Sequence, residues 1–95
     1  MQLKTRDEIQ SEINQARGLQ GFAAANDDAT DKVLALCANQ GDMVAAATAE
    51  NVSAIQFLPL IALALQIIPI IFGEGGFTIE KLQAVLQLIM SIFTT

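Results

Sequence analysis

The feature that most constrains this chain is a run of 23 residues without a charged side chain, from Asn51 to Gly73. As an α-helix the run would be about 34 Å long, enough to cross the roughly 30 Å hydrocarbon core of a bilayer. Its apolar side chains leave no continuous polar face. A helix of this kind either spans a membrane or lies at the centre of a large protein. We therefore expect residues 51–73 to form a membrane-spanning or fully buried helix.

The composition indicates that the chain needs a partner for part of its apolar surface. Apolar residues make up 53% of the 95 residues and charged residues only 16%, whereas an ordinary soluble domain is about 25% charged. A chain of this length can build only one marginal core. We therefore expect the remaining apolar surface to contact a lipid bilayer or other subunits, as a homo-oligomer or within a larger assembly.

Charge and residue usage argue against several classes of function. Ten acidic and five basic residues give a net charge of −5, and nucleic-acid binding relies on Lys and Arg that neutralise phosphates. The sequence has no His and a single cysteine, Cys37, so it lacks the residues for His-based catalysis or a Cys/His zinc site. The acidic cluster of Asp27, Asp28 and Asp31 lacks the spacing of a calcium-binding loop. We expect no enzyme activity, nucleic-acid partner, small-molecule substrate, cofactor or metal.

Residues 1–50 hold eight of the ten acidic residues and are expected to form a polar amphipathic helical arm. Thr5 and Glu8 have the spacing of a capping box, in which the threonine accepts a hydrogen bond from the glutamate amide at the start of a helix. Asp42 is placed to cap a later helix. Three apolar residues recur at helical spacing on one narrow face of the first helix: Ile9, Ile13 and Ala16.

The glycines that follow residues 51–73 predict a reversal of the chain. Gly73, Gly75 and Gly76 can adopt positive φ angles, and they form the predicted hinge, with a glycine turn at residues 74–76. Thr78 can cap a second apolar helix over residues 77–95. Together these features predict an apolar helical hairpin.

Several small or amide side chains are candidates for contacts between helices. The segment Gln56-Phe57-Leu58-Pro59 recurs as Gln66-Ile67-Ile68-Pro69. Each proline removes a backbone donor, and the preceding glutamine can bond the freed carbonyls, bond another subunit or line an oligomeric pore. Amides within an apolar helix, and small residues spaced by four, both favour helix association in membranes. The predicted assembly residues are Ala45, Ala49, Ser53, Gln56, Gln66, Gln83 and Gln87.

These features predict an all-α, small membrane-associated protein, in which a polar N-terminal helical arm precedes an apolar helical hairpin. The expected function is that of a non-enzymatic, membrane-embedded structural or assembly subunit, for example in the virion membrane of a virus or phage or in a bacterial inner membrane. Two alternatives remain open. The chain is similar in plan to small phage holins, which permeabilise membranes as oligomers. It could also be a soluble helical subunit buried in a multi-subunit shell or tube.

Overall fold

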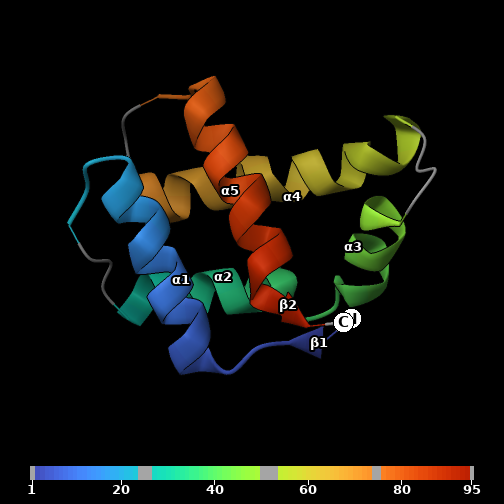
Figure 1. The fold of residues 1–95 in the computed structure, drawn as a ribbon, viewed down its shortest axis with the longest axis horizontal. Coiled ribbons are helices and arrows are strands. Elements are labelled where there is room, and N and C mark those ends of the chain that lie inside the picture. Colours follow the sequence, from blue (N-terminus) through green and yellow to red (C-terminus); the bar gives the residue numbers. More distant parts are fainter. Residues whose placement is uncertain (1, 24–26, 50–53, 74–75, 95) are drawn as a thin grey trace.

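The computed structural model describes residues 2–23, 27–49, 54–73 and 76–94. Within these ranges the chain is mostly helical (Figure 1), and the predicted all-α fold class is confirmed. The two-residue strands β1 and β2 pair in antiparallel fashion and bring the two ends of the chain together. The elements are β1 (Gln2–Leu3), α1 (Arg6–Leu19), α2 (Asp27–Cys37), α3 (Gly41–Thr48), α4 (Ala54–Phe72), α5 (Ile79–Ile92) and β2 (Phe93–Thr94).

The first helix begins as the capping box predicts. The Glu8 amide donates to Thr5 Oγ1 over 3.3 Å, and the Thr5 hydroxyl donates to Glu8 Oε1 over 2.9 Å. Arg6 then joins α1 to α2 through an ion pair of 2.9 Å between its Nε and Asp31 Oδ1. The predicted face of α1 is buried, as its three members show: Ile9, Ile13 and Ala16.

Two predicted helix boundaries are wrong. Asp42 does not cap α3, because the helix starts at Gly41 with Gln40 as its N-cap and without a capping side-chain hydrogen bond. The Asp42 carboxylate lies instead in the first turn, where the partial positive charge of the helix end stabilises it. The last helix ends at Ile92 rather than continuing to residue 95, because the next two residues pair with β1.

One core connects the polar and apolar halves of the chain. Seven side chains of α4 are buried at the spacing of a single helix face, which we call the inner face: Leu60, Leu63, Ala64, Ile67, Ile68, Ile71 and Phe72. All four other helices contact α4. Buried residues of α1, α2, α3 and α5 belong to the same core cluster. Residues 1–50 therefore do not form a separate arm, because their buried side chains pack on the apolar half.

The chain reverses between α4 and α5 at the expected place. Gly73 and Gly76 have φ angles of 64° and 77°, and Gly75 lies outside the described residues. Thr78 caps α5 as predicted, since its Oγ1 accepts the Lys81 amide over 3.1 Å. Helix α5 packs on α4 but crosses it instead of running alongside it (Figure 1). The predicted hairpin is therefore a crossed pair of helices.

Substitution of the turn glycines tests whether the positive φ angles of Gly73 and Gly76 require glycine at these positions. We expect Gly73→Ala and Gly76→Ala each to lower the free energy of unfolding by about 1–2 kcal/mol, because an L-residue is strained in the left-handed region. The measurement is chemical denaturation followed by circular dichroism. Gly18→Ala is the matched control, because Gly18 lies within α1 with open space around its Cβ position and alanine is the better helix former. Equal destabilisation by all three substitutions would show that the positive φ angles of Gly73 and Gly76 do not disfavour alanine.

The thiol of Cys37 should report on folding through its ionisation. Cys37 is fully buried at the end of α2, and burial raises its pKa from 9.0 to about 11. The unfolded thiol releases its proton at lower pH than the folded one, so the folded state loses stability as the pH rises from 9 to 11. We expect a loss of about 2–3 kcal/mol over this range, and no contribution from this group to the pH dependence below pH 8.

Denaturation curves of the natural chain and of Cys37→Ala, measured from pH 8 to 11, separate this effect from the titration of lysines. The difference in unfolding free energy between the two proteins should shrink as the pH rises. A pH-independent difference would show that the folded thiol ionises normally.

Candidate functional site

Helix α4 carries a second apolar face, opposite the inner face. Residues spaced alternately by three and four lie on one side of a helix, and five such residues of α4 are exposed. We call this set the outer stripe: Ile55, Leu58, Ala62, Leu65 and Pro69. The exposed fractions of Ile55, Leu58 and Leu65 are 76%, 60% and 47%. Because α4 contains no charged residue, the outer stripe is an uncharged apolar surface along almost the whole helix.

An apolar groove adjoins the C-terminal end of the outer stripe. It has a volume of about 300 Å³ and is lined by Leu65, Ile68, Pro69, Gly73, Gly76 and Phe77. The Phe77 side chain is 54% exposed, so the groove opens to the surface. None of its lining side chains is titratable or donates a hydrogen bond. The groove therefore suits an apolar side chain or an alkyl group of a partner.

Two basic side chains donate hydrogen bonds to backbone carbonyls at the C-terminal end of α4 and in the turn that follows it, beside this groove. The Arg17 guanidinium, from α1, donates to the carbonyl oxygens of Ile71 and Ala23. The Lys81 ammonium, from α5, donates to the Gly76 carbonyl over 3.0 Å. The last carbonyls of a helix lack intrahelical partners and carry partial negative charge. Arg17 therefore stabilises the end of α4 through Ile71, and Lys81 holds the following turn in place through Gly76.

Two aromatic rings complete this cluster. The rings of Phe22 and Phe72 lie with their centroids 5.4 Å apart, and Lys81 Nζ lies 5.8 Å from each centroid. The face of an aromatic ring attracts a cation within about 6 Å. The two rings therefore stabilise the Lys81 ammonium, although the Lys81 residue is only 7% exposed. The sequence analysis missed this cluster, because its four members are spread over 65 residues and share no spacing.

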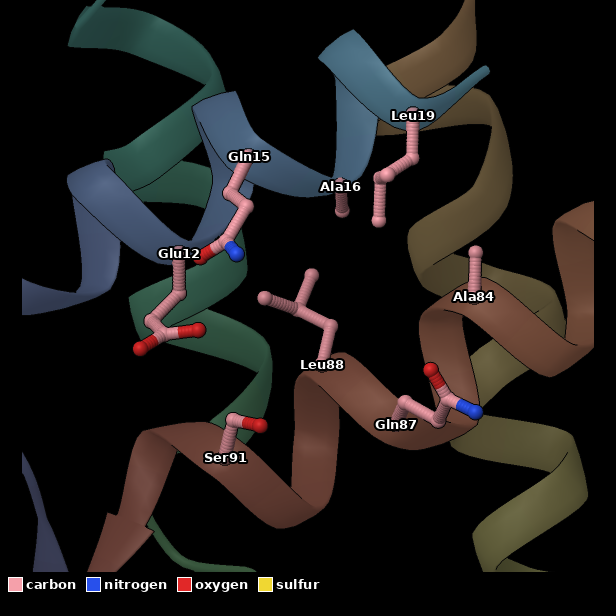
Figure 2. Close-up of a pocket in the computed structure, with 8 residues that line it drawn as sticks. All are labelled: Glu12, Gln15, Ala16, Leu19, Ala84, Gln87, Leu88 and Ser91. Carbon is pink, nitrogen blue, oxygen red and sulfur yellow. The ribbon is translucent and has the colours of Figure 1, made fainter.

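A smaller cavity of about 130 Å³ lies between α1 and α5 (Figure 2). Its polar side chains are Glu12 and Gln15 from α1 and Gln87 and Ser91 from α5, and Leu88 lies between the two helices. Its remaining lining residues are Ala16, Leu19 and Ala84. Glu12 is the only titratable group among them, so the cavity offers hydrogen bonds but no acid–base pair.

The four predicted glutamines all lie on exposed surface. Gln56 and Gln66 lie on α4, and Gln66 borders the outer stripe next to Leu65. Gln83 and Gln87 are both exposed on α5, and Gln87 also lines the cavity against α1. Their roles in contacts between subunits stay predictions.

The predicted stripe of small residues does not follow one helix. Ala45 lies in α3, but the helix ends at Thr48, and Ala49 is extended with φ −66° and ψ 153°. The Thr48 hydroxyl donates to the Val44 carbonyl one turn back over 2.8 Å, a bond that threonine side chains in helices often make. Ser53 lies outside the described residues. The expectation that Ala45 and Ala49 share a helix face is therefore wrong.

Comparison of the chain with protein-family models, curated proteins and solved structures gives no match. Among the residues that the structure describes, no group of three or more Cys, Asp or Glu side chains is placed to hold a metal ion. Because neither a relative nor a metal-binding group indicates a site, the candidate site is chosen by geometry alone. It consists of the outer stripe and the adjoining groove.

Removal of the Arg17 guanidinium should weaken the end of α4 that supports the groove. We expect Arg17→Met to lower the free energy of unfolding by about 1–3 kcal/mol, because it leaves the alkyl stem and removes charged hydrogen bonds to two carbonyls. Lys32→Met removes the same charge from an exposed position in α2 and should change stability by no more than about 0.5 kcal/mol. Thermal or chemical denaturation measures both. Equal effects would show that Arg17 acts only through its net charge.

Proposed function

We propose that this protein is a non-enzymatic assembly subunit that buries the outer stripe of α4 against a second apolar surface. The observation that carries the proposal is the exposure of large apolar side chains along an uncharged helix whose other face already forms the core. Soluble monomers rarely expose a continuous apolar patch of more than a few hundred Å², and such patches mark sites of interaction.

Burial of this surface would contribute favourable free energy to association. Burial of a fully exposed Leu, Ile or Phe side chain contributes about 1.5–3 kcal/mol. Roughly half of that contribution remains available at Ile55, Leu58 and Leu65, which are 47–76% exposed, and at Phe77 beside the groove. Together these side chains offer several kcal/mol to a partner. The groove gives the partner a concave place for an apolar group.

The chemistry of the surface suits binding rather than catalysis. The outer stripe consists of aliphatic side chains and one proline, and the groove adds glycines and a phenylalanine. Catalysis by proton transfer or nucleophilic attack needs titratable or nucleophilic groups at the site. Apolar side chains instead contribute through removal of water when two surfaces meet.

A second candidate function is association with a membrane. The window Ile55–Phe72 has a mean hydropathy of 2.3 and is long enough to cross a bilayer, although the core helix of a soluble protein passes the same test. With its inner face packed on the other helices, α4 would present only the outer stripe to lipid and would lie at the membrane surface. The membrane-spanning, holin-like and virion settings stay predictions.

Charged substitutions on the outer stripe test the proposal. We expect Leu58→Glu combined with Leu65→Glu to weaken association at least about tenfold, because two carboxylates would have to lose their water at the contact. Both positions are exposed, so helicity measured by circular dichroism should stay unchanged. Association is measured by analytical ultracentrifugation and by flotation with phosphatidylcholine vesicles.

The matched control places the same two charges on the exposed surface of α1, as Ser11→Glu with Gln15→Glu, and should leave association through α4 unchanged. The proposal is overturned if the natural chain neither self-associates nor binds vesicles. It is also overturned if the control substitutions weaken association as much as Leu58→Glu with Leu65→Glu.

A further inference from the structure

Resting on the proposed function, the geometry points to a second copy of this chain as the partner of the outer stripe. We propose that the α4 helices of two copies cross at Ala62 around a two-fold axis. Such a contact is isologous, so the same patch on both copies must be complementary to itself. Three properties of α4 favour such a contact: the central position of the small residue Ala62, the lack of charge on the helix, and the apolar area that it exposes.

The small residue lies at the middle of the helix. Helix α4 runs from Ala54 to Phe72, so Ala62 is one residue from its midpoint, and it is exposed. A small side chain at the crossing point allows two helix axes to approach to about 8 Å. The larger Leu58 and Leu65 lie on either side of Ala62 along the stripe. If the two-fold axis through Ala62 is perpendicular to the helices, they cross antiparallel, and Leu58 of each copy lies beside Leu65 of the other. The large side chains then flank the close approach.

The distribution of charge favours this contact over one with anionic lipid. The chain carries a net charge of −5, so two copies repel each other except where the contact surfaces are uncharged. Helix α4 has no charged residue and provides such a surface. Helices that bind anionic membranes carry Lys or Arg on their polar face. The basic side chains at the end of α4, Arg17 and Lys81, donate instead to carbonyls of this chain.

The exposed area fits a dimer of modest affinity. A large apolar side chain has on the order of 150–200 Å² of surface. With the exposed fractions of Ile55, Leu58, Leu65 and Phe77, these four side chains offer roughly 400 Å² per copy. A stable interface buries about 800 Å² per partner, and smaller interfaces are typical of weak, reversible complexes. The dimer is therefore expected to form at micromolar concentrations and to dissociate on dilution.

Disulfide crosslinking between copies tests the position of the axis. A crossing at about 8–10 Å between axes, with Cα atoms about 2.3 Å from each axis, places facing Cα atoms about 3.4–5.4 Å apart. The upper part of this range is one that a disulfide can bridge, from about 4.4 Å upward. Single cysteines are introduced by Leu58→Cys, Ala62→Cys, Leu65→Cys and, as the control at an exposed position of α1, Ser11→Cys, each combined with Cys37→Ala. The same series with Cys37 retained is the second set, because that thiol is buried and reacts slowly.

We expect Ala62→Cys to give the most covalent dimer under mild oxidation, because the axis brings this position against itself. The Leu58→Cys and Leu65→Cys chains should crosslink better when mixed than when either is oxidised alone. Ser11→Cys should give little dimer. Addition of Leu65→Glu to Ala62→Cys should lower the yield about tenfold. Equal yields at positions 62 and 11, or no effect of Leu65→Glu, would overturn the proposed axis.

Sedimentation of the natural chain separates this inference from the proposed function. A monomer at about 100 μM, several-fold above the micromolar range expected for so small an interface, overturns the second copy as partner. If vesicle binding is then still lost with Leu58→Glu and Leu65→Glu, the assembly function stands and lipid is the partner. If the chain is monomeric and vesicle binding is absent, both proposals fail.

Discussion

Every other helix of the chain packs against α4, an uncharged helix that is apolar on all sides. Its inner face, from Leu60 to Phe72, forms the centre of the core. A chain of 95 residues has too few helices to surround such a segment completely, because small domains bury a smaller share of their surface than large ones. The chain therefore covers one side of α4 and leaves the outer stripe exposed. The fold and the proposed assembly function both follow from this incomplete coverage.

The C-terminal end of α4 is where distant parts of the chain are joined. Arg17 reaches it from α1 and Lys81 from α5, and the rings of Phe22 and Phe72 lie beneath the cations. The Arg17 contact satisfies the Ile71 carbonyl, which the helix itself cannot bond, and the Lys81 contact satisfies the Gly76 carbonyl in the turn. They also fix the turn at Gly73 and Gly76, which forms part of the groove beside the outer stripe. The stability of the core and the shape of the candidate site therefore depend on the same cluster.

Local signals in the sequence predicted the elements that depend on near neighbours. Thr5 and Thr78 begin helices as expected, because a capping hydroxyl needs only an amide three residues away. The buried face of α1 follows from the spacing of its apolar residues among polar ones. The prediction that Asp42 caps α3 failed, because an acidic residue suits both the cap and the first turn of a helix.

The sequence by itself determined the helical class, the uncharged segment and the glycine turn, because each of these depends on residues that are close together along the chain. Only the tertiary structure decided which side of α4 is covered. Leu63 and Leu65 are equally apolar in the sequence, yet one is buried and the other is 47% exposed, because helix periodicity carries no information where every position is apolar. Only the tertiary structure also decided that Lys81 is buried and that β1 pairs with β2. They depend on residues that only folding brings together.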